Sequence, residues 1–376
     1  MKFKLSNPIY YLLVVAVAAV VAELLHVDPI LIFILSAVGL IPLAKLIGEA
    51  TEELAIYTGP KVGGLLNATL GNAAELIIAI FAIQAGLLDL VRASITGSII
   101  GNLLIVLGAS LLLGGLKNGT QRFDRRSAGL NATLLILAVI ALAIPSLFDP
   151  GLATHPDSEL LFNEGVAIIL IVLYGLSVIY SFRMGKPADV HVEEGVREVA
   201  AVNREPAEVH TARWTRKFSV IMLILATVGT AIVSETLVGA VEPVTQQLGL
   251  TEFFLGIIII PLVGNVAEHL VAVQVAMKNK MELSLAVSLG SSLQVALLVA
   301  PLLLFVSLLF GQRLLLVFNE YELITLIGAS VIAAFIAQDG ESNWLEGAML
   351  LAVYLIVTLA FLFLPAVMEA APLAAH

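Results

Sequence analysis

The sequence has no cysteine and little charge, and both absences narrow the class of protein that it encodes. Without cysteine, the 376-residue chain has no disulfide framework, no thiol nucleophile and no thiolate metal site. Charged residues make up 13% of the chain, whereas soluble domains carry about 25%. Apolar residues make up 60%, and the mean hydropathy is +1.03. The sequence therefore predicts an all-α polytopic membrane protein, with the lipid bilayer as its surroundings.

Basic residues are also scarce, which excludes a further class of partner. The net charge is −10, and a nucleic-acid-binding protein needs a basic face, so we expect no nucleic acid. The six histidines are scattered and form no zinc-like spacing. We expect no cofactor and no enzymatic activity. Ligand binding is left mainly to oxygen atoms.

Long apolar runs are what the sequence does contain. A membrane-spanning helix needs about 20 mostly apolar residues. Eleven segments fit: 8–25, 29–47, 62–86, 91–115, 127–147, 164–183, 214–237, 251–277, 282–309, 319–338 and 344–368. The first segment also has the features of a cleaved signal peptide, although its apolar run continues past any cleavage point, which favours a retained span.

The distribution of basic residues predicts the orientation. With the N-terminus in the cytoplasm, 17 of the 19 Lys and Arg residues fall in cytoplasmic segments, and only Arg92 and Arg313 fall outside. This split is what the positive-inside rule expects. It predicts a cytoplasmic N-terminus and an external C-terminus. The membrane is the plasma membrane if the source is prokaryotic, and the vacuolar membrane if it is a fungus or plant.

One long polar segment, residues 184–213, separates the first six predicted spans from the last five. It holds six acidic and four basic residues. Val192, Val196 and Val199 recur at helical spacing, which predicts a short amphipathic helix on the cytoplasmic surface. A solvated linker and a regulatory element both remain open.

Two segments match without a gap at an offset of 193 residues. They read Gly71-Asn72-Ala-Ala-Glu75 and Gly264-Asn265-Val-Ala-Glu268. Asn and Glu are rare in membrane spans, so the match indicates a duplication. The copies lie in the third and eighth spans, which cross the membrane in opposite directions. This inverted repeat is typical of secondary transporters. The chain divides into an N-terminal helix (1–27), a five-helix repeat (28–183), the linker (184–213) and a second five-helix repeat (214–376).

The repeated motif supplies ligands for a hard divalent cation. Each Asn lies three residues before its Glu and so shares its helical face, which would bring two carboxylates and two amide oxygens together if the helices cross. Ca²⁺ takes six to eight such oxygens. Without the ion, two desolvated carboxylates side by side would take up protons instead. Glycines and a proline in both copies would allow the helices to break and offer carbonyls: Gly63, Gly64, Gly71, Gly256, Pro261 and Gly264.

Further polar residues are secondary candidates. Auxiliary groups in the spans are Ser98, Asn102, Ser291, Gln294 and His269, and carboxylates expected at the two mouths are Glu52 and Glu235. Each has a structural alternative: helix packing for the span residues, a satisfied packing histidine for His269, and ordinary charges at span ends for the glutamates. The motif residues have structural alternatives too: a single Asn in a span often joins two helices by a hydrogen bond, and a single Glu near a span end is often an interface residue.

With these motifs, the sequence resembles the calcium/proton exchanger family of the cation/calcium antiporter superfamily. The resemblance covers nearly the whole chain and is most specific over residues 63–75 and 264–269, with support from 50–54, 97–102 and 290–294. It implies one N-terminal orientation helix and two inverted five-helix repeats. It also implies that Glu75 and Glu268 bind Ca²⁺ and protons alternately, helped by Asn72 and Asn265.

The resemblance implies proton coupling, because sodium/calcium exchangers carry a different motif where Ala-Ala and Val-Ala stand here. The linker is less acidic than in the family, which leaves a calcium-sensing role unsupported. We expect an antiporter that exports Ca²⁺ from the cytoplasm in exchange for H⁺. A Na⁺/Ca²⁺ exchanger or a carrier of Mn²⁺ or a monovalent cation is the alternative on the same fold. A cation channel and a membrane hydrolase are more distant alternatives, and homo-oligomer formation stays open.

Overall fold

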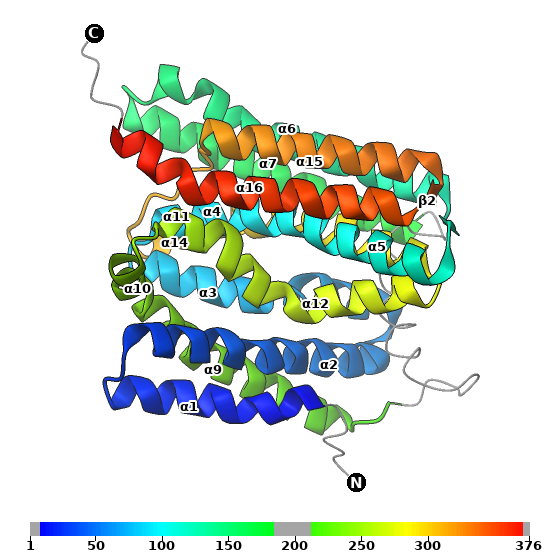
Figure 1. Cartoon of the computed structure of the whole chain (residues 1–376), viewed down its shortest axis with the longest axis horizontal. Coiled ribbons are helices and arrows are strands. Elements are labelled where there is room, and N and C mark those ends of the chain that lie inside the picture. Colours follow the sequence, from blue (N-terminus) through cyan, green and yellow to red (C-terminus); the bar gives the residue numbers. More distant parts are fainter. Residues whose placement is uncertain (1–7, 184–211, 371–376) are drawn as a thin grey trace.

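The computed structural model describes residues 8–183 and 212–370, which fold into a bundle of long helices (Figure 1). The elements of the first half are η1 (Pro8–Leu12), α1 (Leu13–Leu24), α2 (Pro29–Leu70), α3 (Ala73–Gln84), α4 (Leu88–Ile100), η2 (Gly101–Val106), α5 (Leu107–Asn118), β1 (Gln121–Arg122), α6 (Arg125–Leu152) and α7 (Pro156–Arg183). The elements of the second half are α9 (Arg216–Gly239), α10 (Val241–Leu248), α11 (Glu252–Phe254), η3 (Leu255–Ile259), α12 (Ile260–Met277), α13 (Met281–Gln294), η4 (Val295–Val299), α14 (Ala300–Leu309), α15 (Glu320–Asp339), β2 (Glu341–Ser342) and α16 (Trp344–Ala370).

Nine helices of the described segments are long and apolar enough to cross a membrane. They coincide with nine of the eleven predicted spans. The other two predicted spans, 8–25 and 62–86, contain the shorter apolar helices Ile9–Leu24 and Ala73–Gln84. The prediction of a helical, multi-span protein is confirmed, and the count of eleven stays a prediction. The predicted linker helix falls almost entirely on residues 184–211, outside the described part.

The helices form layers around a central group (Figure 1). α1, α2 and α9 pack together on one side, and α6, α7, α15 and α16 lie on the other. Between them lie α3, α4, α5 and α12, with α12 in contact with α2, α4, α5 and α13. The two β elements form a short antiparallel pair, in which Gln121 is opposite Ser342. Both copies of the Asn-Glu motif therefore lie inside the bundle.

The third predicted span is interrupted where the first motif lies. α2 ends at Leu70, Gly71 and Asn72 form a turn, and α3 begins at Ala73. In the second copy, α12 continues through Gly264 and Asn265 without a break. The break that these residues would allow therefore occurs in the first copy, and the second copy has a π-helical turn, η3, before a continuous helix. Pro261 lies just after η3, inside the continuous helical span Glu252–Met277, and because proline has no backbone N–H it leaves a carbonyl of the preceding turn without its helical hydrogen bond.

α2 itself folds back before it reaches the motif. A Cβ added to Gly63 would lie 2.8 Å from the Cβ of Ala55, eight residues earlier. In a straight helix eight residues span about 12 Å. The backbone must therefore reverse between these two residues, and the part of α2 that precedes Gly71 runs separately from its long membrane-crossing part.

π-helical turns occur at three places close to the motifs: η2 follows α4, η4 follows α13, and η3 precedes α12. Adding 193 to the bounds of α4 and η2 gives 281–293 and 294–299, which match α13 and η4 to within one residue. π-Helical turns are rare in proteins, and those that do occur are often found at functional sites. The sequence offset of the motifs is therefore also an offset of local structure.

Candidate functional site

Glu75, in the first turn of α3, receives hydrogen bonds from two other helices. Its Oε1 accepts one from Ser98 Oγ of α4 at 2.7 Å and one from Asn265 Nδ2 of α12 at 2.5 Å. Its Oε2 is buried and has no hydrogen-bond partner among the described residues. Two elements that are far apart in the sequence thus hold one carboxylate oxygen and leave the other available.

Gly264 makes room for this carboxylate. A Cβ at position 264 would lie 3.1 Å from Cγ of Glu75, closer than most side-chain contacts. The motif glycine of the second copy therefore lets the Glu75 side chain lie against α12, where it reaches Asn265. The other motif glycine, Gly71, lies in the turn that interrupts the first copy.

The two motif asparagines have different partners. Asn265 donates to Glu75, the glutamate of the other copy. Asn72, which is 2% exposed, donates instead to Oε1 of Gln294 on α13 at 2.9 Å, and its own Oδ1 is buried without a partner in the described segments. The pairing is thus not symmetric: one glutamate is held by an asparagine of the opposite copy and the other is not.

Glu268 lies on α12, half-buried and close enough to Glu75 for the two carboxylates to repel each other when both are charged. Ser291 of α13 lies beside Glu268, although its buried hydroxyl has no geometrically satisfactory partner among the described residues. The two glutamates that the sequence singled out are therefore neighbours. Ser98 and Ser291 lie beside one glutamate each.

Unpaired buried oxygens are the main electrostatic feature of the site. Glu75 Oε2, Asn72 Oδ1 and Ser291 Oγ are all buried and lack partners within the described segments. A buried polar atom without a partner is unfavourable, and oxygens of these types are what a hard cation prefers. No three His, Asp or Glu side chains gather as a metal site in the described ranges. A cation here would need amide, hydroxyl or carbonyl oxygens beside the two carboxylates.

Besides Ser291, the auxiliary candidates Asn102 and His269 also make no hydrogen bond to this network within the described ranges. Asn102 is 2% exposed, and its Nδ2 is buried without a partner in the described part of the chain. The Nε2 of His269 is likewise buried and unpartnered there. Both residues lie in helices that build the site, η2 and α12, so their roles stay predictions.

The candidate mouth carboxylates lie in unequal surroundings. Glu52 is half-buried at the end of the long part of α2, beside Glu49 and Glu53 and within reach of the charges of Lys45 and Arg213. Glu235 on α9 is exposed. Neither belongs to the hydrogen-bond network of Glu75, and their proposed attraction of cations stays a prediction.

Sequence reasoning missed the role of the neighbouring Glu53. Its Oε2 accepts the backbone N–H groups of Arg213 at 2.9 Å and Trp214 at 3.2 Å, and Tyr57 Oη donates to the Trp214 carbonyl at 2.5 Å. These bonds join the start of the second half to α2, the first long helix of the first half. The only sequence signal was a second glutamate directly after Glu52, to which no role had been assigned.

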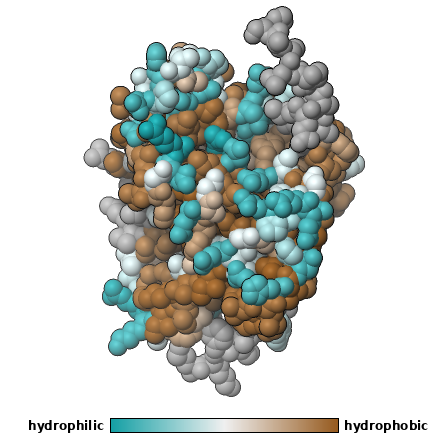
Figure 2. Space-filling model, turned by 90° about the vertical axis from the view of Figure 1, so that its left-hand side faces the viewer, coloured by the Kyte–Doolittle hydropathy of each residue, from teal (hydrophilic) through white to brown (hydrophobic). Residues whose placement is uncertain are grey.

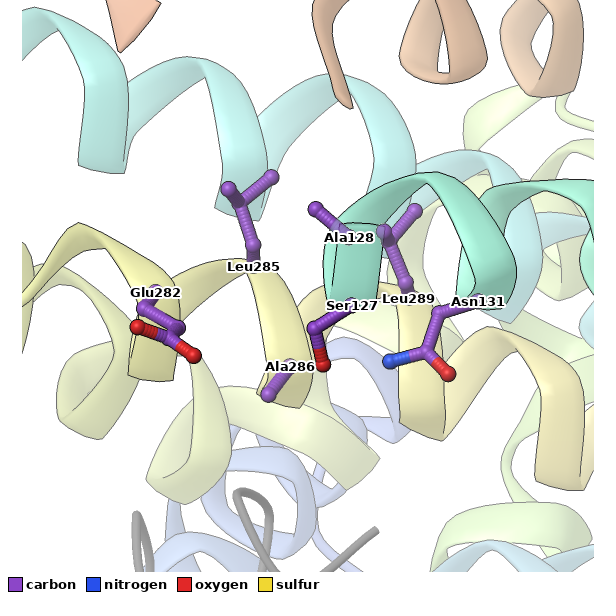
Figure 3. A pocket seen from close by; sticks show the side chains of 7 residues that line it. All are labelled: Ser127, Ala128, Asn131, Glu282, Leu285, Ala286 and Leu289. Atoms are coloured by element: carbon purple, nitrogen blue, oxygen red, sulfur yellow. The ribbon is translucent and has the colours of Figure 1, made fainter. Parts of the chain in front are cut away.

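A separate small pocket lies between the first turns of α6 and α13 (Figure 3). Its lining comprises Ser127, Ala128, Asn131, Glu282, Leu285, Ala286 and Leu289. None of the predicted site residues lines it. The pocket therefore does not form part of the site around Glu75.

The end of the bundle that carries α10 and α11 is shown in Figure 2, where hydrophilic residues gather across the middle of the face. Acidic side chains of this end include Asp89, Glu242 and Glu252, which lie close enough to interact. Arg92, one of the two basic residues predicted to lie outside the membrane, forms an ion pair with Asp89 at this end. The sidedness of this face stays a prediction.

Comparison with known proteins gives consistent similarities. Residues 29–183 and 218–363 match the family described as sodium/calcium exchanger protein. The chain is 42% identical over 378 residues to a Ca²⁺/H⁺ antiporter of Aphanothece halophytica, covering 97% of this chain and 99% of that protein. It is 41% identical over 361 residues to the Ca²⁺/H⁺ antiporter ChaA of Bacillus subtilis, covering 95% and 100%. The solved structure of native YfkE superimposes with a TM-score of 0.80 at 38% identity, covering 94% of this chain and 99% of that one.

Proposed function

This chain belongs to the calcium/proton exchanger family, within the wider family of sodium/calcium exchanger proteins, and we propose that it exports Ca²⁺ from the cytoplasm in exchange for protons. The relatives named above are Ca²⁺/H⁺ antiporters that match nearly the full length of the chain. Transport, rather than an enzymatic reaction, is therefore the activity proposed, with Ca²⁺ and H⁺ as substrates and no cofactor.

The observation that supports this proposal most strongly is the state of Glu75. One oxygen of the buried carboxylate is fixed by Ser98 and Asn265, and the other has no partner in the described segments. Glu268 lies close by. We take these two carboxylates as the groups that bind Ca²⁺, with the free oxygens of Asn72 and Ser291 as supporting ligands.

Charge balance explains why the same groups would couple the two ions. Two ionised carboxylates inside a membrane protein are strongly disfavoured, because each loses its hydration and they repel each other. One Ca²⁺ or two protons would neutralise the pair equally. If only the neutralised site can change the side to which it opens, Ca²⁺ leaves one side only when protons return from the other.

We further propose that the ion site opens alternately to the two sides of the membrane as two inverted five-helix repeats, residues 28–183 and 214–376, move against each other. Residues 1–27 would be an additional helix, and residues 184–213 would be the linker. The equivalent positions of α4–η2 and α13–η4 support this arrangement. So does the direction of the motif helices: α12 runs away from the end that carries α11, whereas α3 runs toward it (Figure 1). The broken first motif and the unbroken second motif represent one of the two states of such a cycle.

Calcium flux into sealed proteoliposomes tests this proposal. With sodium and potassium absent, an imposed pH gradient should drive Ca²⁺ accumulation that stops when the gradient is collapsed. Accumulation that requires a sodium gradient at equal pH on both sides would assign the chain to sodium coupling. Passive Ca²⁺ entry that ignores both gradients would indicate a channel and contradict antiport.

A further inference from the structure

A second buried carboxylate takes no part in the proposed exchange. Glu322 lies in the first turn of α15 and is 3% exposed. It belongs to a capping box: its Oε2 accepts the backbone N–H of Asn319 at 2.9 Å, and the Asn319 side chain accepts the backbone N–H of Glu322 at 2.9 Å. A capping box needs only these two bonds and is equally effective at the surface. The burial of Glu322 therefore calls for another explanation.

The other oxygen of Glu322 leads to α4, the helix that carries Ser98. Glu322 Oε1 accepts a hydrogen bond from Thr96 Oγ1 at 2.7 Å. The Thr96 hydroxyl also lies near the carbonyls of Arg92 at 3.3 Å and Ala93 at 3.1 Å. A hydroxyl has one hydrogen, and the shorter bond to an ionisable carboxyl group is the stronger. The bond between α4 and α15 is therefore the main one.

Three consecutive residues of α4 contact three different neighbours. Thr96 bonds to Glu322 of α15, and Ser98 bonds to Glu75 of α3. Between them, Gly97 lies so close to the carbonyl of Ile257 in η3 that a Cβ could not fit. Residues two apart in a helix point about 200° away from each other, so the bonds of Thr96 and Ser98 hold α4 from opposite sides.

The rotation of α4 about its own axis decides whether the Ser98 hydroxyl reaches Glu75. Gly97 has no side chain to resist such a rotation. Thr96, on the opposite face, is tied to a helix that packs along α6 on the side of the bundle away from α1, α2 and α9. Arg92 and Asp89, also on α4, pair with each other and lie near enough to Glu322 for their opposite charges to act on it. The hydrogen bond that joins α4 to Glu322 comes from Thr96.

We propose that Glu322 is a positioning residue of the cation site, which acts through Thr96 to set the rotation of α4 and so holds Ser98 against Glu75. This inference rests on the proposed role of Glu75 in ion binding. Glu322 does not contact the transported ion. Its effect is on the affinity of the site rather than on the existence of exchange.

The test compares variants of Thr96, Ser98 and Asn319 in full-length protein reconstituted into proteoliposomes. Thr96→Val removes the hydroxyl at nearly constant shape, and Thr96→Ser retains it. Asn319→Ala removes the side-chain cap of α15 but leaves the bond between Thr96 and Glu322, and so controls for loss of stability. The readouts are the KM for Ca²⁺ and the maximal rate of uptake driven by a pH gradient, together with the melting temperature in detergent.

Thr96→Val is expected to raise the KM for Ca²⁺ by about fivefold, the usual effect of one lost hydrogen bond. Thr96→Ser should stay within about twofold of the wild type. Asn319→Ala should lower the melting temperature with little change in KM. Because Thr96 acts through Ser98, the double variant Thr96→Val/Ser98→Ala should have the KM of Ser98→Ala alone. If Thr96→Val does not fold, Thr96→Ala replaces it in the test, with the same expected rise in the KM for Ca²⁺.

An unchanged KM in folded Thr96→Val protein would overturn the inference, as would a double variant in which the two effects multiply. Neither result would affect the proposed exchange, because wild-type uptake and its loss in a Glu75→Gln variant are measured in the same assay. Normal uptake by the Glu75→Gln variant would instead refute the proposed role of Glu75 in exchange, and the inference about Glu322, which rests on that role, would be refuted as well.

Discussion

Replacing Glu75 with Gln is expected to abolish proton-driven Ca²⁺ uptake. An amide of the same shape keeps an oxygen for Ser98 and Asn265 but has neither the negative charge that binds Ca²⁺ nor a group that takes up a proton. Loss of one charged ligand should weaken Ca²⁺ binding by at least about tenfold. Exchange should fall further, to the background of empty liposomes, because the proton-carrying step is lost as well.

The matched control for this substitution is Glu346→Gln. Glu346 is also a half-buried glutamate at the start of a helix, and its Oε1 accepts a hydrogen bond from the amide of Asn343 at 2.9 Å, much as Glu75 accepts one from Asn265. It lies in α16, and its side-chain hydrogen bonds in the described part of the chain are with Asn343 rather than with a motif residue. The control should exchange Ca²⁺ at a rate near that of the wild type. Uptake by Glu75→Gln at the rate of this control would refute the ion-binding role of Glu75.

Replacing Gly97 with Ala is the second substitution with a large expected effect. A Cβ at position 97 would overlap the carbonyl of Ile257, and the backbone of η3 cannot move aside as a flexible side chain could. Gly256 on the η3 side of the same contact is also crowded, since its Cβ would lie 2.6 Å from the Leu90 carbonyl. Overpacking of this kind destabilises by about 1–3 kcal/mol. It should also displace Ser98, the next residue, from Glu75 and reduce uptake severalfold.

Gly101→Ala, one turn further along, provides the comparison. A Cβ added to Gly101 would meet no atom within 4 Å beyond the adjoining residues and backbone of its own helix, and alanine favours helical backbone over glycine by about 0.5–1 kcal/mol. The two variants should therefore shift the melting temperature in opposite directions, down for Gly97→Ala and unchanged or up for Gly101→Ala. Equal melting temperatures for both variants would show that the close contact between α4 and η3 is not a constraint in the folded protein.

Sequence reasoning placed the helices well because apolar length is a strong signal. It also anticipated that Gly71-Asn72 and Gly264-Asn265 belong together and that Ser98 lies near the site, because polar residues in apolar spans are costly and few. Nothing in the sequence indicated that Gly97 and Gly101 differ in their packing. Both are glycines on one face of a helix, but only Gly97 contacts another backbone. The difference depends on where η3 crosses, which no local pattern encodes.

The asymmetry of the two motifs was equally hidden. Nearly identical sequences form a turn at Gly71-Asn72 and a continuous helix at Gly264-Asn265, because the surrounding packing, and not the motif, decides the local conformation. The partner of Asn72 was also unexpected, since Gln294 lies 222 positions away. The proposed role of Glu322 could not be derived from the sequence, because a glutamate three residues after an asparagine at a helix start is explained fully by a capping box.

The central claim is that Ca²⁺ and protons compete for the same two carboxylates. The most direct measurement is the release of protons when Ca²⁺ is added to the purified protein in a weakly buffered solution near neutral pH, followed with a pH-sensitive dye. The wild-type protein should release protons as Ca²⁺ binds, and more of them as the starting pH is lowered. The Glu75→Gln/Glu268→Gln double variant should release none. Wild-type protein that binds Ca²⁺ without proton release at any starting pH, or a double variant that releases as many protons as the wild type, would contradict the account.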